Sequence, residues 1–165
     1  MSRWWLSRCF PLALLYVAIA GCAPGFDVRT DFDSNADLSA PKFYGWAPRA
    51  TGNVTGLLEA RLKGAIESQL LAKGFTPASD AASAQLLVHY HVVIEKKTSI
   101  YDSGYSPVFG RQITVDQYKE GTLVIDVIDA ARKQVVWRGS ASGVVSESKP
   151  GSNIEPAVAQ IMASF

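Results

Sequence analysis

Hydrophobic and polar residues alternate in several stretches of the chain, which is the pattern of strands with one buried face. The first stretch is Phe26 to Phe32, and a short aromatic strand is predicted at Lys42 to Trp46. Leu86 to Lys97 is the longest stretch, and its even-numbered positions form a continuous apolar face. Thr122 to Asp129 and Gln134 to Val145 complete the five predicted strands.

Two other segments repeat their apolar residues at helical spacing. The first is predicted to run from Val54 to Lys73, with Asn53 as its N-cap and Gly74 just beyond its C-terminus. The second is predicted for the C-terminal segment that ends at Phe165. The stripe of the first helix, which we expect to face the core, consists of Leu58, Leu62, Ile66 and Leu70.

The order of these elements predicts the fold class. Two helices cannot cover both faces of a five-stranded sheet, so we expect an α+β fold. It would be a two-layer sandwich, with a mostly antiparallel sheet of about five strands and both helices packed on one face. Ala130 to Lys133 fits a four-residue hairpin loop, so the last three strands are expected to form an antiparallel meander.

The segment from Thr98 to Glu120 lacks regular alternation and is predicted to be a long irregular loop. Such loops are uncommon unless they are functional or disordered. Tyrosine also provides contact area at a low entropic cost. The segment is therefore the candidate interaction surface, although a long hairpin whose aromatic residues fold back onto the sheet is an alternative. The aromatic residues concerned are Tyr101, Tyr105, Phe109 and Tyr118.

The N-terminus has the pattern of an export signal. Met1 to Arg8 carries two positive charges and no acidic residue, and an uncharged apolar run of about a dozen residues follows. A membrane-spanning helix needs about 20 apolar residues, so this run is too short to span a bilayer. The run ends in Ile19-Ala20-Gly21-Cys22, which resembles the lipobox of bacterial lipoproteins.

We therefore expect residues 1–21 to be a lipoprotein signal peptide that is cleaved between Gly21 and Cys22. Acyl chains on Cys22 would then attach the protein to a membrane. Residues 22–25 would form a lipidated tether, and residues 26–165 a single α+β domain. Ala23 stands where an Asp would retain an enterobacterial lipoprotein at the inner membrane, so we expect an outer-membrane protein that faces the periplasm.

Charge and cysteine content exclude several classes of function. Loss of Arg3 and Arg8 with the leader changes the net charge of the chain from +1 to −1, and no basic block is present. A nucleic-acid-binding surface is therefore not expected. Cys9 lies in the leader, which leaves Cys22 as the sole cysteine of the mature chain. A single cysteine can form neither an internal disulfide nor a cysteine-based zinc site.

Several motifs resemble a family of bacterial lipoproteins known as domain of unknown function 4136. Gln85 departs from the pattern, because the family usually has an Asp there. The resemblance implies an envelope lipoprotein and brings no activity with it. The motifs are Asp31-Phe32-Asp33, Ala36-Asp37-Leu38, Phe43 to Ala47, Ala65-Ile66, Lys73-Gly74-Phe75, Ala84 to Tyr90, Gly121 to Asp126 with Asp129, and Val136 to Gly139 with Ala141.

His89 and His91 are the weak metal candidates. At positions i and i+2 of a strand they project from one face, about 6.6 Å apart along it. A catalytic zinc needs a third ligand, for which Glu95 or Asp126 would have to serve. The alternative is that both histidines are ordinary polar residues of a strand.

Asp126 lies within an apolar strand, as Arg138 does in the next one. A buried carboxylate needs a partner, so a cross-strand pair between the two is the structural interpretation. A general acid or base with a shifted pKa is the functional alternative.

No nucleophile motif, catalytic residue or cofactor is predicted. The sequence therefore favours a lipid-anchored envelope protein that acts as a non-catalytic binding or structural module. Its expected partners are the membrane, through Cys22, and another envelope protein, with no nucleic acid. The alternative is a metal-dependent or other periplasmic hydrolase that uses His89 and His91.

Overall fold

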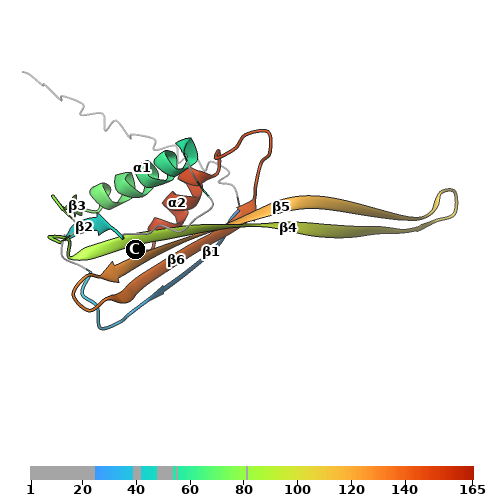
Figure 1. Ribbon diagram of the computed structural model, residues 1–165. Coiled ribbons are helices and arrows are strands. Elements are labelled where there is room, and N and C mark those ends of the chain that lie inside the picture. Colours follow the sequence, from blue (N-terminus) through green and yellow to red (C-terminus); the bar gives the residue numbers. More distant parts are fainter. Residues whose placement is uncertain (1–24, 39–41, 48–53, 55, 81) are drawn as a thin grey trace, which may run out of the picture.

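The computed structural model describes residues 25–38, 42–47, 54, 56–80 and 82–165 of the chain (Figure 1). The predicted signal peptide, the Gly21–Cys22 cleavage site and the lipidated cysteine lie outside these residues. The helices and strands are β1 (Asp27–Phe32), β2 (Phe43–Trp46), α1 (Leu57–Ala72), β3 (Thr76–Pro77), β4 (Leu86–Ser106), β5 (Gly110–Asp129), β6 (Gln134–Val144) and α2 (Ile154–Met162).

The strands form one open sheet of six strands in the order β1-β6-β5-β4-β2-β3. Both helices lie on the same face of this sheet (Figure 1). The α+β class is therefore confirmed, but the prediction of about five strands was one too few. The missed strand is β3, which has only two residues and leaves no alternation to recognise.

The pairing of the strands is mixed. The pairs β1–β6, β6–β5 and β5–β4 are antiparallel, so the predicted meander of the last three strands is confirmed. Strand β2 runs parallel to both of its neighbours, β4 and β3. The parallel pairs arise because helix α1 returns the chain to the same end of the sheet before β3 and β4 begin.

Helix α1 starts later than the sequence predicts. The residue before it, Gly56, has a φ of 65°, a left-handed conformation that ends the helical pattern and leaves Val54 outside the helix. The predicted cap Asn53 lies outside the described residues. At the other end, the N–H of Phe75 donates to Leu70 O, and that of Gly74 to Leu71 O. With Gly74 at a φ of 86°, this is a Schellman motif, as expected for a glycine there.

The core lies between the helices and the inner face of the sheet. Leu62, Ile66 and Leu70 of the predicted stripe are buried, whereas Leu58 is half-buried. Full burial of such a side chain contributes about 1.5–3 kcal/mol. The strands and α2 supply the rest of the core, which includes Leu86, Val88, Tyr90, Ile125, Val127, Trp137, Val158, Ile161 and Met162. Neither helix of the described part of the chain is long and apolar enough to cross a membrane.

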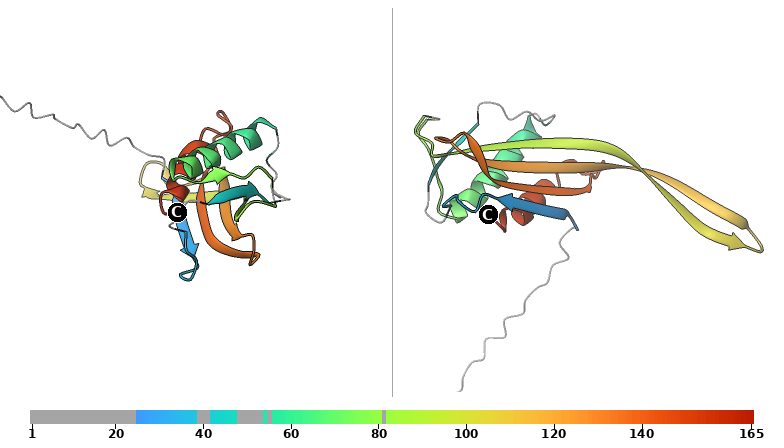
Figure 2. Two further views of the ribbon diagram at one scale, coloured as in Figure 1. Left: turned by 90° about the vertical axis from the view of Figure 1, so that its left-hand side faces the viewer. Right: turned by 90° about the horizontal axis from the view of Figure 1, so that it is seen from below.

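The predicted loop from Thr98 to Glu120 is wrong, because this segment continues β4 and β5 as a two-stranded hairpin. The two strands pair from Leu86–Asp129 out to Ser106–Gly110, with one shift of register between Asp102 and Tyr105. Beyond the Glu120–Val144 pair, no further strand pairing joins them to β6. Residues 97–118, here called the arm, extend away from the body of the domain (Figures 1 and 2).

Candidate functional site

Four charged or polar side chains form a row across the sheet on the face opposite the helices. His89 on β4 pairs in register with Asp126 on β5. Asp126 pairs in turn with Arg138 on β6, and Arg138 pairs with Asp31 on β1. The sequence neighbours of His89, Asp126 and Arg138 point to the core, because side chains alternate between the two faces of a strand. The row is therefore a direct product of strand register.

Arg138 makes a two-pronged contact with Asp126. Its Nε lies 2.6 Å from Oδ1, and its Nη2 lies 2.9 Å from Oδ2. This is the bidentate geometry that makes an Arg–carboxylate pair strong. The hydrogen bonds and charge of Asp126 raise the pKa of Arg138, and the charge of Asp31 adds to the effect. Asp126 is only 5% exposed, so the predicted cross-strand pair supplies the partner that its burial requires.

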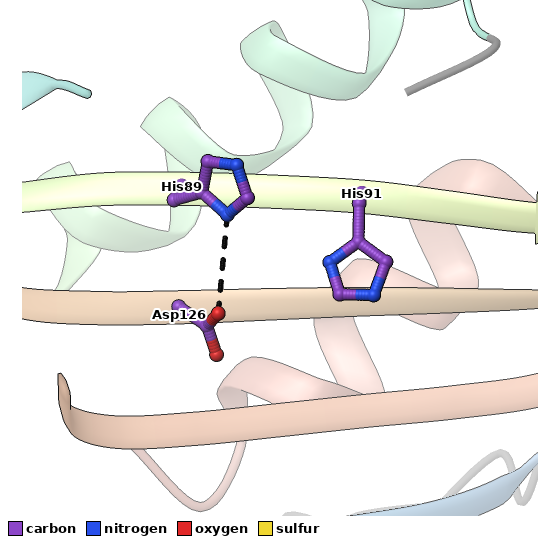
Figure 3. A group of neighbouring side chains, drawn as sticks. All are labelled: His89, His91 and Asp126. Carbon is purple, nitrogen blue, oxygen red and sulfur yellow. Dashed lines mark ion pairs between the residues drawn. The ribbon is translucent and has the colours of Figure 1, made fainter. Parts of the chain in front are cut away.

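The two histidines lie beside Asp126 (Figure 3). His89 Nδ1 is 3.8 Å from Asp126 Oδ2, and the rings of His89 and His91 are 6.1 Å apart between centroids. One nitrogen of each histidine and one oxygen of Asp126 lie within 4.8 Å of one another. Of the two acids proposed as a third ligand, the structure thus brings Asp126 to the histidines. Glu95 instead lies beside Lys97, with its Oε2 3.4 Å from Nζ.

These three side chains could hold a divalent metal only in competition with Arg138. Histidine nitrogens and carboxylate oxygens are suitable zinc ligands, and three of them leave a position open for water. Both oxygens of Asp126, however, already accept hydrogen bonds from a cation. A metal ion would have to displace the guanidinium of Arg138 or bind next to its positive charge. The arrangement is therefore that of an ion pair flanked by histidines.

The aromatic residues of the arm face the solvent. The exposed fractions of Tyr101, Tyr105 and Phe109 are 67%, 78% and 74%, whereas Tyr118 is half-buried opposite Lys97. Of the alternative interpretation of this segment, the hairpin is confirmed by the pairing of β4 with β5. Its other part, that the aromatic residues fold back onto the sheet, is wrong for the first three.

Four aliphatic residues of the arm are exposed as well, and the sequence interpretation missed them. Ile100 pairs directly with Val115 across the hairpin, and Ile113 lies two residues before Val115 on the same face. Val108 lies at the tip, next to Phe109. The alternation of Ile113 and Val115 with polar residues could have revealed a strand here, because a period of two is typical of strands.

Asp102 makes polar contacts near the tip of the arm, one of them across its two strands. The Nε of Arg111 donates to Asp102 Oδ2 at 3.0 Å, and the N–H of Gly104 donates to Asp102 Oδ1 at 3.0 Å. These bonds lower the pKa of Asp102, so its carboxylate is charged at neutral pH. Gly104 and Gly110 have φ values of 80° and 72°, which glycine adopts without strain. The apolar side chains are thus presented on a hairpin with a defined end.

Comparison with known families decides where the chain belongs. The model of a family described as domain of unknown function 4136 matches residues 28–165. The chain belongs to this family. The match covers all eight helices and strands except the first residue of β1. No curated protein matches the sequence.

Solved structures show that this fold recurs among distant relatives. A member of the same family from Bacteroides thetaiotaomicron has a TM-score of 0.60 at 17% identity, with 84% of this chain and 95% of that chain covered. A PelC dodecamer from Paraburkholderia phytofirmans has a TM-score of 0.50 at 13% identity, with coverages of 86% and 98%.

A PDZ domain protein from Parabacteroides distasonis is also similar, with a TM-score of 0.54 at 16% identity. The alignment covers 83% of this chain but only 35% of that protein, so the chain spans about a third of its length. At these identities the likeness concerns the fold.

Proposed function

We propose that this protein is a lipid-anchored module of the bacterial envelope that binds another envelope protein through its arm and performs no chemistry of its own. The observation that carries the proposal is the exposure of large apolar side chains on a two-stranded hairpin outside the body of the domain. The residues concerned are Ile100, Tyr101, Tyr105, Val108, Phe109, Ile113 and Val115.

The energetics of the arm favour a partner that covers it. Clustered apolar side chains on a surface mark interaction sites, because they gain free energy when removed from water. Full burial of one such side chain contributes about 1.5–3 kcal/mol, so a few of them can support a specific complex. A two-stranded hairpin has little stability of its own, and a covering protein would also stabilise its pairing.

The position of the proposed anchor supports a task at the membrane. Strand β1 begins at Asp27, which pairs with Ser142 near the base of the arm. Cys22 precedes Phe26 by four residues, which span at most about 14 Å when extended. Acylation of Cys22 would therefore hold the base of the arm close to the membrane. We propose the outer membrane, with the domain on its periplasmic side.

Substitution of the arm tests the binding proposal. Tyr101→Ser, Tyr105→Ser and Phe109→Ser together should abolish co-purification of a partner from cross-linked envelopes while leaving the thermal unfolding of the body unchanged. A matched control is Phe32→Ser with Phe43→Ser, because both phenylalanines are exposed on the body. Equal recovery of the same partner with both variants would contradict the proposal.

The anchor needs its own test, because the arm could bind a partner without it. Cys22→Ser should yield an uncleaved precursor that incorporates no alkyne-labelled fatty acid in living cells. The wild-type chain should be labelled and should fractionate with outer membranes. Normal labelling of the mutant would show that Cys22 is not the lipidated residue.

Metal-dependent hydrolysis is a second candidate function, favoured by one observation. His89, His91 and Asp126 bring three metal-binding atoms within 4.8 Å of one another. The bidentate contact of Arg138 with Asp126 weighs against it, since the guanidinium occupies the carboxylate that a metal would need. Zinc binding by the purified domain distinguishes the two candidates.

A further inference from the structure

An apolar pocket of about 550 Å³ opens at the base of the arm, on the helix side of the sheet. This volume lies within the usual range for ligand pockets, about 300–1,000 Å³. Most of the lining is aliphatic and comes from both helices and the sheet. Its main residues are Leu58, Leu62, Val92, Ile94, Leu123 and Ile154.

Two glycines keep the sheet at the pocket free of side chains. Gly121 on β5 and Gly143 on β6 pair directly with each other. A Cβ on Gly121 would lie 2.8 Å from Val145 Cγ2, and one on Gly143 would lie 2.7 Å from Phe26 Cδ1. Val145 and Phe26 therefore rest on bare backbone and add further apolar surface to the lining.

The polar residues lie at the rim of the pocket, and most of them are already bonded. Lys119 Nζ is 2.7 Å from Glu147 Oε1, and Asn153 Nδ2 donates to Val144 O at 2.9 Å. Lys149 also lies at the rim and adds a positive charge to it. A matching ligand would have an apolar body that needs no hydrogen bonds and a head group that meets a basic rim.

The chain just before the described residues favours a lipid as this ligand. Phe26 lines the pocket, and Cys22 can be at most about 14 Å from it along an extended chain. This step rests on the proposed acylation of Cys22, which would place the pocket at the membrane surface. There, aliphatic chains are the abundant apolar ligand.

We propose that the pocket at the base of the arm binds the acyl chain of a lipid that is not covalently attached to the protein. The aliphatic wall takes the chain, and Lys149 lies where it can meet an anionic head group. The site is separate from the arm's exposed side chains, so it adds lipid recognition to the proposed protein-binding role.

The binding test needs neither a membrane nor the anchor. The core residues lie between Tyr44 and Met162, with Phe26 and Val28 packed against them, so a chain of residues 23–165 keeps the whole core. Titrated with the fluorescent fatty acid cis-parinaric acid, it should show saturable binding at one site per chain. Displacement by palmitate but not by lysophosphatidylglycerol identifies a free fatty acid as the ligand source, whereas displacement by the anionic lysophosphatidylglycerol as well identifies a membrane lipid.

Adjacent residues of β4 provide a matched pair of variants. Ile94 lines the pocket and is 53% exposed, while Val93 points to the opposite face and is 43% exposed. Ile94→Gln, alone and with Leu58→Gln, should weaken probe binding, about tenfold or more for the pair, whereas Val93→Gln should leave it unchanged. The single Ile94→Gln variant keeps the test valid if the double variant unfolds.

Three results would overturn the acyl-chain proposal. The first is the absence of saturable binding, and the second is equal binding by the Ile94→Gln and Val93→Gln variants. The third is self-association of the domain that Ile94→Gln abolishes without changing probe binding, because the pocket would then receive a second copy of the chain. Since the measurement omits the anchor and any protein partner, a negative result leaves both parts of the proposed function standing.

Discussion

The indole of Trp137 occupies the space that a side chain at Gly139 would need. The two residues lie on the inner face of β6, and a Cβ on Gly139 would be 2.4 Å from Trp137 Cη2 and 2.4 Å from Ile161 Cγ2. Trp137 itself is 2% exposed, so its indole is part of the core. Helix α2 therefore depends on a glycine at this position to pack against the sheet.

Substitution of Gly139 should be costly for this reason. Gly139→Ala forces a methyl group into a filled space and should destabilise the domain by about 1–3 kcal/mol, measured by urea denaturation. Gly64→Ala is the matched control, because its Cβ would meet nothing within 4 Å on helix α1. The control should be stabilising by about 0.5–1 kcal/mol, since alanine is the better helix former. Equal effects of the two substitutions would contradict the packing described.

The ion pair of Asp126 and Arg138 should contribute more than a surface pair. Arg138→Leu leaves a buried carboxylate without its partner and should cost about 1–3 kcal/mol, the usual penalty for an unsatisfied buried group. In the control pair, Arg29 Nη2 lies 2.8 Å from Asp27 Oδ2, but both side chains are well exposed. Arg29→Leu should therefore leave the free energy of unfolding nearly unchanged. Similar losses in both variants would show that burial of Asp126 does not matter.

Tyr90 should make the stability of the domain depend on alkaline pH. Its side chain is 1% exposed and its hydroxyl donates to Glu59 Oε1 at 3.2 Å. Burial, together with the charge of Glu59, raises the pKa of Tyr90 to about 12. An unfolded tyrosine has a pKa of about 10, so the folded state holds the proton more tightly. The stabilisation is complete below pH ~10 and is lost as the pH rises to ~12.

The comparison with Tyr90→Phe isolates this effect from other titrating groups. Between about pH 9 and about pH 12, the wild-type domain should lose on the order of 2 kcal/mol more unfolding free energy than the variant. Chemical denaturation at several pH values measures the difference. Parallel pH profiles of the two proteins would mean that the phenol ionises in the folded state as readily as in water.

Zinc binding separates the two candidate functions. We expect no stoichiometric uptake of zinc by the purified domain at micromolar concentrations, because Arg138 holds both oxygens of Asp126. Arg138→Ala should strengthen zinc binding, and His89→Ala with His91→Ala should then remove it. Isothermal titration calorimetry gives the stoichiometry. Tight binding of one zinc per native chain, lost in the double histidine variant, would favour the hydrolase.

The sequence predicted the elements that bury one face and missed those that do not. Leu86, Val88 and Tyr90 alternate because one side of β4 contacts the core, and the pairing of Asp126 with Arg138 followed from charges in neighbouring apolar strands. The arm has water on both faces, so no burial imposes a period of two along its length, and the alternation is limited to Ile113 and Val115. Its strands are held by backbone pairing and by local contacts such as Asp102–Arg111.

Local irregularities also escaped the sequence pattern. Val127 pairs with Trp137 but Ile128 pairs with Val135, so Val136 is the extra residue of a β-bulge. The bulge places both Val136 and Trp137 in buried positions, which simple alternation does not allow. The pocket at the base of the arm was equally hidden, because its lining comes from segments far apart in the sequence.

Site-specific photocross-linking in living cells tests most directly whether the arm binds an envelope protein. A photoreactive phenylalanine analogue in place of Tyr105, on the arm, should capture a defined envelope protein, and the Tyr101→Ser, Phe109→Ser background should remove that product. The same analogue in place of Phe32, which is exposed on β1, should not capture it. Capture of the same protein from both positions, or from Phe32 alone, would contradict binding through the arm.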